Sequence, residues 1–327
     1  MARLRVLFLG GTISMTLEGS SAGATPRLGS TEILAGLADR LPGQVEVEGV
    51  DLCRVGSSHL TFDHLLDLAR AAEAAAADGV DGVVVVQGTD SMEESSWFLD
   101  LLWGHDIPVV LTGAMRNPSL PGADGDANLL SALAVTADPA WRGQGALLLL
   151  NDEVHAARLV AKRHTSSPAA FESPGSGPLG RMLEGRAVPL VRVDRRAPLP
   201  LPATVPTTIP VHVAAVGEDA QVLQSLGAIA DGLVVAGFGA GHLKADVAEV
   251  AGELARRIPV VLTSRTGAGS VHTSTYGGAG SEEDLLAKGL VNGGHLAPLK
   301  ARLLLALLLG DGADHDAIRA AFAEHAG

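Results

Sequence analysis

Short runs of apolar residues recur along the chain, and glycine or small polar residues follow most of them directly. Four valines in a row, at 83–86, predict a strand that is buried on both faces. Amphipathic stretches separate the runs, and in one of them, after a possible capping residue at Thr61, apolar residues recur at helical spacing as far as Gly79. The strand-like runs of the first half lie at 4–9, 45–52, 83–86, 107–111 and 146–150. Strands that alternate with helices predict parallel pairing, right-handed crossovers and helices on both faces of the sheet.

A proline-rich segment divides the chain into two unequal parts. Residues 189–210 contain six prolines, and because such a segment sustains neither a helix nor a central strand, we expect an interdomain linker. A smaller pattern follows, with strands at 211–216, 232–235 and 258–262 and helices at 219–229, 245–256 and 297–309. The sequence therefore predicts an α/β protein with a larger N-terminal parallel-sheet domain (1–188), helices on both of its faces, and a smaller C-terminal α/β domain (211–327).

The composition indicates a globular protein and limits its partners. The chain has 327 residues, of which 47% are hydrophobic and 40 are glycines, as suits a large core with many tight turns. Its net charge of −13 argues against binding to a nucleic-acid backbone or to an anionic membrane. No apolar run reaches the roughly 18 residues of a membrane span. Small neutral or zwitterionic molecules remain open as substrates.

The N-terminal apolar run and the single cysteine argue against several further classes of protein. Cys53 permits neither a disulfide framework nor a cysteine zinc site within one chain, and we expect a buried residue without a chemical role. The run at 4–9 passes into Gly10 and Gly11 without the cleavage site of a signal peptide, so we expect a cytoplasmic protein. These glycines lack both the GxGxxG spacing and the lysine of nucleotide-binding loops.

The loop after the four valines is the first candidate for chemistry. Gly88, Thr89 and Asp90 follow the predicted strand, and ligands of open α/β sheets bind at such carboxyl ends. A helix begins directly afterwards, and Asp90 with Glu93 three residues later also fits an N-terminal capping box. On this stretch alone, a helix cap is the simpler interpretation of Asp90.

Hydroxyl groups occur at three predicted strand ends, as Thr12, Ser57 and Thr89. Three of them at one edge of a sheet, with Asp90 and Lys162, indicate a nucleophile surrounded by polar substrate clamps. A threonine hydroxyl needs a base or a proton relay to act as a nucleophile, and a lysine oriented by an aspartate can serve as one. Backbone amides of glycine-rich turns can stabilise an oxyanion. Taken alone, Lys162 stands among other basic residues and is most simply part of a solvated face.

Five segments together resemble the bacterial-type L-asparaginase and glutaminase family. They are LGGTIS at 9–14, GTDSMEES at 88–95, GAMRNP at 113–118, AKRHTS at 161–166 and SRTGAGS at 264–270, in that family's order and spacing. Each segment is weak alone, but the combination is highly specific and covers essentially the whole chain. The resemblance implies an N-terminal catalytic and a C-terminal asparaginase domain, no metal or organic cofactor, and hydrolysis of a side-chain amide through an acyl-enzyme.

The resemblance also implies roles for single residues. Thr12 falls on the family's usual nucleophile, and Thr89, Asp90 and Lys162 fall on its second catalytic group. Ser57 falls on the residue that holds the α-carboxylate of the substrate, and Asp90 would also bind the α-amino group. By this analogy, Asp90 is more than a helix cap and Lys162 is not a surface residue.

The sequence departs from the family in the long loop at 14–30, which we expect to act as a lid. The family carries a tyrosine there that relays a proton from the threonine, whereas this chain's only tyrosine is Tyr276. We hypothesise that Tyr276 enters the site of a neighbouring subunit and replaces the missing phenol; the alternative is that it only packs at a subunit contact. Glu282 corresponds to a glutamate that the family contributes to the neighbour's site.

Three further positions differ from the family. His242 stands where the secreted enzymes tend to have asparagine, and Gln87 stands where histidine is frequent. Ser58, which we retain as a substrate-binding candidate, stands where several relatives place a glutamine that touches substrate. These differences bear on amide preference and affinity more than on the fold.

We therefore expect a cytoplasmic L-asparagine amidohydrolase that gives L-aspartate and ammonia through a threonine acyl-enzyme. The resemblance implies a homotetramer built from intimate dimers, with sites between subunits. L-glutamine, D-asparagine or another small amide is the rival substrate, and a catalytically weak ligand-binding relative is the rival class. The excess of acidic over basic residues, with no basic patch in the sequence, argues against a nucleic-acid partner such as the tRNA of an amidotransferase.

Overall fold

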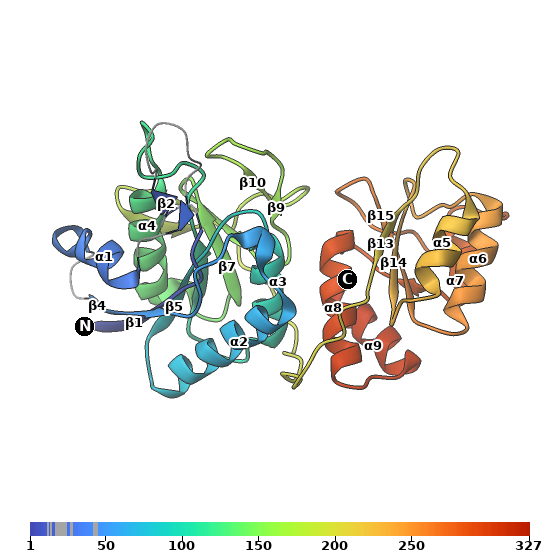
Figure 1. The fold of residues 1–327 in the computed structure, drawn as a ribbon, viewed down its shortest axis with the longest axis horizontal. Helices are drawn as coiled ribbons and strands as arrows, with labels where there is room; N and C mark the ends of the chain where they lie inside the picture. The colour runs from blue at the N-terminus through green and yellow to red at the C-terminus, as the bar shows by residue number, and fades with distance from the viewer. Residues whose placement is uncertain (12, 14, 17–24, 27–28, 42–44) are drawn as a thin grey trace. The chain divides into compact units, whose positions relative to one another are not determined.

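The chain forms two compact units, Met1–Leu199 and Pro200–Gly327, here called the N-terminal and C-terminal domains (Figure 1). The computed structural model describes residues 1–11, 13, 15–16, 25–26, 29–41 and 45–327. Residues 190–210, all of them described, form neither helix nor strand, and the boundary between the two units falls within this proline-rich stretch.

A mixed sheet forms the centre of the N-terminal domain, with the strand order β12-β11-β8-β7-β6-β5-β1-β4. The strands are β1 (Ala2–Phe8), β4 (Val45–Asp51), β5 (Gly82–Val86), β6 (Val109–Thr112), β7 (Ala146–Leu150), β8 (Glu153–Ala156), β11 (Gly180–Leu183) and β12 (Arg186–Pro189). The five strands from β4 to β7 in this order pair in parallel, as predicted. All five residues of β5 are buried, as expected for a strand that is covered on both faces.

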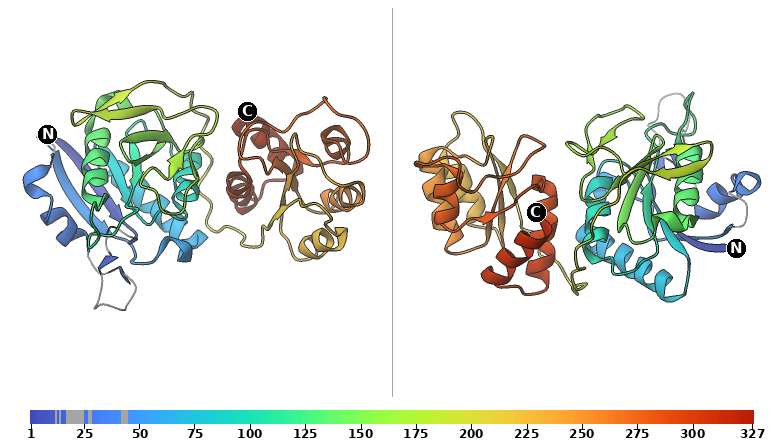
Figure 2. Two further views of the ribbon diagram at one scale, coloured as in Figure 1. Left: turned by 90° about the horizontal axis from the view of Figure 1, so that it is seen from above. Right: turned by 180° about the vertical axis from the view of Figure 1, so that it is seen from behind.

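Helices cover both faces of this sheet (Figure 2). One face carries α1 (Ser30–Ala35) and α4 (Gly125–Ala137), and the other carries α2 (Phe62–Ala77) and α3 (Met92–Leu102). The predicted helix cap at Thr61 is confirmed, because its hydroxyl accepts a hydrogen bond from the amide of His64. Short 3-10 helices lie at Ala38–Arg40, Ser57–His59 and Pro139–Trp141. The predicted α/β class is therefore confirmed.

The edge of the sheet beyond β7 is antiparallel, which the sequence reading did not foresee. β8 pairs with β7, β11 with β8 and β12 with β11, all in antiparallel register. Two-residue turns close two of these hairpins: Asn151 and Asp152 both have positive φ, and so do Glu184 and Gly185. Such turns match the twist of paired strands and favour Asn, Asp and Gly. The signal was thus present in the sequence as the pair Asn151-Asp152.

Two short antiparallel pairs lie outside this sheet. β2 (Met15–Thr16) pairs with β3 (Thr25–Pro26), and β9 (Ala161–Lys162) pairs with β10 (Phe171–Glu172). The first pair belongs to the predicted lid at 14–30, most of which lies outside the described residues. The second pair carries Lys162.

The C-terminal domain contains a smaller parallel sheet in the order β13-β14-β15-β16. Its strands are β13 (Val211–Val213), β14 (Leu233–Gly237), β15 (Val260–Ser264) and β16 (Val291–Asn292). The helices are α5 (Ala220–Gly227), α6 (Ala245–Ala255), α7 (Glu282–Ala287), α8 (Pro298–Gly310) and α9 (His315–His325). Helices α5 to α7 lie on one face of the sheet and α8 and α9 on the other (Figure 1). The predicted smaller α/β domain is confirmed, while β16, α7 and α9 were not assigned from the sequence.

The strand order reverses direction between β1 and β5, whose carboxyl ends lie side by side in the sheet. From β1 the chain runs outward to β4 on one side, whereas from β5 it runs to β6 on the opposite side. Loops that leave in opposite directions open a space between them, and ligands of open α/β sheets bind at such switch points.

Glycines let the loops after β1, β4 and β5 meet at this edge of the sheet. A Cβ atom on Gly11 would lie 2.1 Å from the amide nitrogen of Gly88, and one on Gly88 would lie 2.7 Å from the hydroxyl oxygen of Ser57. Gly11 also has a φ of 94°, in the left-handed region that favours glycine. The loops can therefore touch only because these two positions lack side chains.

Replacing Gly11 with alanine should force these loops apart. We expect the free energy of unfolding to fall by about 3 kcal/mol, from the left-handed backbone and from overpacking. Urea titration measures this loss, with Gly36→Ala as the control, because Gly36 ends α1 with a negative φ and its added Cβ would find its nearest atom at 3.5 Å. A Gly11→Ala protein as stable as the control would contradict the close approach of the loops.

Candidate active site

The side chain of Lys162 joins Thr89 to Asp90. Lys162 Nζ donates hydrogen bonds to Thr89 Oγ1 at 2.9 Å and to Asp90 Oδ1 at 2.7 Å. The lysine side chain is only 15% exposed and Thr89 is buried, whereas the Asp90 side chain is 67% exposed. The lysine is thus not part of a solvated face, and the carboxylate beside it is open to solvent or to a ligand.

Ser57 lies against the same loop and fixes its backbone. Its Oγ accepts a hydrogen bond from the amide of Asp90 at 3.1 Å, and its carbonyl oxygen accepts one from the Ser91 hydroxyl at 2.8 Å. Ser57 is buried, while the next residue, Ser58, is exposed. The structure therefore brings Ser57, Thr89, Asp90 and Lys162 together, although Lys162 lies far from the others in sequence.

The start of α3 decides between the two interpretations of Asp90. The helix begins at Met92 with Ser91 as its N-cap, and that residue makes no side-chain capping bond. Asp90 binds Lys162, and Glu93, its expected partner in a capping box, accepts a hydrogen bond from the amide of Lys162. The capping interpretation was wrong, because a contact with a distant residue engages both carboxylates.

The sequence did not predict the hydrogen bond from Ser91 to Ser57 or the one from the Lys162 amide to Glu93. Ser91 and Glu93 both lie within the segment GTDSMEES, so the family resemblance covered them without assigning them a role. No local pattern marks a glutamate as the acceptor of an amide that is 69 residues away. Only the folded chain reveals the pair.

Thr12, the predicted nucleophile, lies outside the described residues, and so does most of the predicted lid at 14–30. The residues on either side of Thr12 are placed. Gly11 packs against Gly88, and Ile13 is buried against the start of α4, where a Cβ on Gly125 would lie 2.7 Å from it. Gly11, the residue before Thr12, therefore lies beside the loop that carries Thr89.

In the C-terminal domain, Glu282 organises the loop before α7. Its side chain is fully buried, and Oε1 accepts hydrogen bonds from the amides of Thr275 and Tyr276 at 2.8 Å each. Oε2 lies 3.0 Å from Nε2 of His242, and the ring of His242 packs edge-on against the Tyr276 ring. Tyr276 is 51% exposed and lies almost parallel to the ring of His272. Glu282 therefore points inward, and the loop presents Tyr276 to solvent.

The contacts of Glu282 lower its pKa below the ordinary value. Burial of the carboxylate raises the pKa, but hydrogen bonds from the amides of Tyr276, Glu282 itself and Thr275, and from His242, together outweigh that effect. Because the folded-state pKa is the lower one, the charged carboxylate stabilises the fold above the ordinary carboxyl pKa. This contribution is lost as the pH falls through the folded-state value.

Cys53 is only partly buried, although the sequence predicted a buried residue. It follows β4, and its Sγ donates to the carbonyl oxygen of Leu9 at 3.5 Å. Burial raises the pKa of the thiol, which keeps it protonated and unreactive at neutral pH. The expectation of a residue without a chemical role stays a prediction.

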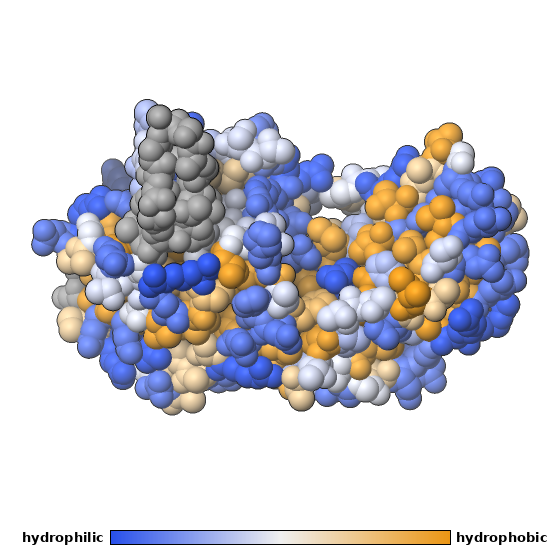
Figure 3. Space-filling view, in the orientation of Figure 1, coloured by the Kyte–Doolittle hydropathy of each residue, from blue (hydrophilic) through white to orange (hydrophobic). Residues whose placement is uncertain are grey.

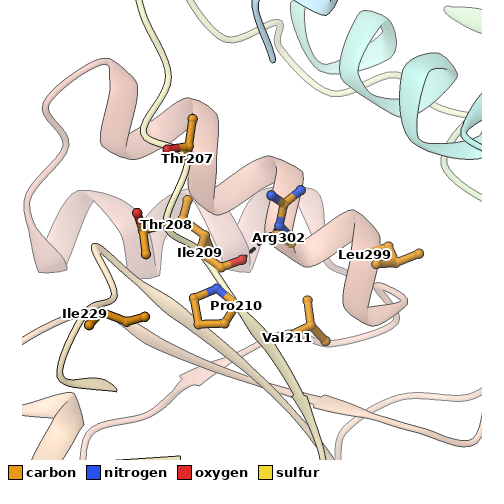
Figure 4. A pocket seen from close by; sticks show the side chains of 8 residues that line it. All are labelled: Thr207, Thr208, Ile209, Pro210, Val211, Ile229, Leu299 and Arg302. Carbon is orange, nitrogen blue, oxygen red and sulfur yellow. Dashed lines mark hydrogen bonds between the residues drawn. The ribbon is translucent and has the colours of Figure 1, made fainter. Parts of the chain in front are cut away.

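A separate hollow of about 400 Å³ lies in the C-terminal domain (Figure 4). It is lined by Thr207, Thr208, Ile209, Pro210, Val211, Ile229, Leu299 and Arg302. Arg302 donates from Nε to the carbonyl oxygen of Ile209 at 2.8 Å. These eight residues include no carboxylate and no titrating base, so the hollow is not a candidate for amide hydrolysis. Hydrophobic residues also gather on the visible face of this domain (Figure 3).

The part of the chain that the structure describes contains neither a metal site of clustered ligands nor a membrane-spanning helix. There, no three His, Cys, Asp or Glu side chains are grouped so as to hold a metal ion. Within the same residues, no helix is long and apolar enough to cross a membrane.

Replacing Glu282 with glutamine should destabilise the protein in a pH-dependent way. At about pH 7 we expect a melting temperature several degrees below that of the wild type, because a neutral amide replaces a charged acceptor of three hydrogen bonds. The difference should shrink as the pH falls below the ordinary carboxyl pKa, because the stabilisation by the charged carboxylate is lost down to its lowered folded-state pKa. Thermal unfolding measures it, with the exposed neighbour Glu283→Gln as the control. A difference that stays constant with pH would contradict the assignment.

Two family models match the chain and together span most of it. The model described as "Asparaginase, N-terminal" matches residues 3–193. The model described as "Glutaminase/Asparaginase C-terminal domain" matches residues 210–322. The two matches follow the two domains of the structure.

Individual relatives agree with these family models over most of their length. A probable L-asparaginase of Deinococcus radiodurans is 35% identical, over 99% of this chain and 98% of its own. A probable periplasmic L-asparaginase of Haemophilus influenzae is 31% identical, over 98% of this chain and 93% of its own. The crystal structure of a probable cytoplasmic L-asparaginase from Campylobacter jejuni matches with a TM-score of 0.89 at 29% identity, covering 99% of this chain and 100% of that one. The chain therefore belongs to the bacterial-type L-asparaginase and glutaminase family of amidohydrolases.

Proposed function

We propose that the protein hydrolyses the side-chain amide of L-asparagine to L-aspartate and ammonia. The observation that carries the proposal is the Lys162 ammonium between Thr89 and Asp90, in the loop where Gly88 packs against Gly11. The Thr12 hydroxyl attacks the amide carbon, and loss of ammonia leaves an ester on this residue. Water then cleaves the ester, which releases aspartate and restores the threonine.

The hydrogen-bond directions around Lys162 suit this chemistry. The lysine donates to Thr89 Oγ1, so the threonine's own hydroxyl hydrogen is available to a leaving amine. Asp90 accepts from the lysine through Oδ1, and its exposed carboxylate is available to the α-amino group of the substrate. Ser57 accepts from the Asp90 amide, which leaves its hydroxyl hydrogen for the α-carboxylate. Ser58 stays a predicted second contact with the substrate.

The assembly and the location of the enzyme belong to the same proposal. We place the sites between subunits of a homotetramer built from intimate dimers, without a nucleic-acid or membrane partner and without a cofactor. We also propose a cytoplasmic enzyme, as the Campylobacter neighbour is named, although the Haemophilus relative is named periplasmic. Light scattering of the purified protein and fractionation of the source cells test these two points.

Ammonia release from L-asparagine, L-glutamine and D-asparagine tests the reaction and its substrate. We expect L-asparagine to give the highest kcat/KM and Thr12→Ala to lower kcat by about 10³-fold or more, because the variant lacks the nucleophile. The Thr61→Ala variant, which changes a helix cap, is the control and should stay within about threefold. A faster rate with another amide would change the substrate. No release with any of them, while aspartate raises the melting temperature, would favour a ligand-binding relative.

The Tyr276→Phe variant tests the source of the phenol that the loop at 14–30 lacks. We propose that the exposed Tyr276 ring enters the neighbouring subunit's site, held there by the backbone contacts of Glu282. We expect kcat to fall by about 100-fold, because the hydroxyl that relays the proton is removed. Full activity would mean that Tyr276 only packs at a subunit contact.

Mixed oligomers identify which subunit uses Tyr276. A Thr12→Ala subunit still offers its tyrosine to a partner, and a Tyr276→Phe subunit still holds an intact nucleophile. Co-expression of the two variants should therefore restore one complete site in each mixed pair. If both residues serve the same subunit's site, no mixed pair gains activity.

A further inference from the structure

Lys162 sits on a very short hairpin outside the main sheet. β9 and β10 pair through only two positions, Phe171 with Lys162 and Glu172 with Ala161. So short a ladder gives little stability of its own, because isolated two-stranded hairpins are marginal even when longer. Lys162 is also the only lysine in residues 1–199 of the sequence. Other contacts must hold this lysine at hydrogen-bonding distance from Thr89.

The first such contact comes from Glu93 in the opening turn of α3. Its Oε2 accepts a hydrogen bond from the Lys162 amide at 2.5 Å. Glu93 is only three residues after Asp90, so one short segment binds the lysine twice, at its side chain through Asp90 and at its backbone through Glu93. A charged acceptor makes a stronger bond than a neutral one.

The second contact ties the other strand of the hairpin to the main sheet. Ser173 directly follows β10, and its Oγ lies 2.9 Å from Nδ1 of His155 on β8. His155 is 1% and Ser173 6% exposed, and Glu153 Oε2 lies 3.4 Å from the other ring nitrogen of the histidine. Glu153 in turn pairs with Arg181 on β11. The hairpin is therefore fixed to β8 through a buried polar pair.

We propose that Glu93 and Ser173 are positioning residues that hold the Lys162 hairpin in register with Thr89. Glu93 fixes the strand that carries the lysine, and Ser173, through His155, fixes the strand paired with it. A shift of about 1 Å would break the bond between Lys162 Nζ and Thr89 Oγ1, and misplacement of this size lowers turnover rather than binding. This inference rests on the proposed function for its effect on catalysis, but not for its effect on the lysine.

Two pairs of variants separate positioning from general stability. Glu93→Ala and Ser173→Ala remove the acceptor or the hydroxyl, whereas Glu93→Gln and Ser173→Thr retain a group that can make the same bond. Ser176→Ala is the matched control, because Ser176 lies in the turn after Ser173 and its hydroxyl makes only long contacts of 3.4 Å. We expect the two alanine variants to lower kcat for amide hydrolysis about 10-fold with KM within about twofold. The conservative variants should recover most of that loss.

Acylation of lysine amines provides a readout that does not need the reaction. Trace labelling with acetic anhydride, followed by peptide mass analysis, gives the rate at Lys162 relative to Lys244, whose side chain is 53% exposed. In the wild type the ratio should be well below one, because Lys162 is mostly buried and bonded to two residues. It should rise severalfold in Glu93→Ala and Ser173→Ala, and stay unchanged in Ser176→Ala.

The outcomes are distinct. An unchanged labelling ratio in both alanine variants would overturn the proposal, and so would a loss of kcat that Ser176→Ala shares. A parallel rise in KM would indicate general disruption of the site and would also overturn it. A wild type that releases no ammonia would refute the proposed function alone, because the labelling ratio still shows whether the two residues hold Lys162.

Discussion

Gly11 and Gly88 meet backbone to backbone at the carboxyl edge of the N-terminal sheet, and a side chain on either would separate them. Parallel pairing of β1 with β5 brings both loops to the same edge, at the point where the strand order reverses. Ser57 packs against the other side of Gly88. The loops after β1, β4 and β5 therefore lie in contact. Short side chains such as those of Ser57 and Thr89 are enough to bring their polar groups close together.

The positive charge beside Thr89 and Asp90 comes from Lys162, which lies outside the main sheet. Lys162 reaches Thr89 and Asp90 from a hairpin of two residue pairs, so its position depends on contacts made by its backbone and by the paired strand. An ammonium that is largely removed from water is costly unless it is paired, and Asp90 supplies the counter-charge. Because Asp90 is itself exposed, this pair leaves a carboxylate open to solvent or to a ligand.

Glu282 shows how hydrogen bonds allow a carboxylate to be fully buried. A buried charge must be hydrogen-bonded, and here two backbone amides and His242 satisfy it within its own domain. The result is a fixed backbone at Thr275 and Tyr276. Glu282 thus holds the backbone that carries the neighbouring aromatic ring.

The sequence by itself determined the α/β class, the buried strand at 83–86, the helix capped by Thr61 and the hydroxyl residues at strand ends, because local periodicity, capping and turn chemistry fix these features. The antiparallel edge, the inward turn of Glu282 and the partners of Asp90 and Glu93 were decided only by the tertiary structure. A carboxylate near the start of a helix can cap that helix or bind a distant lysine. The choice depends on which partner the fold brings within about 3 Å, and sequence spacing does not contain that distance.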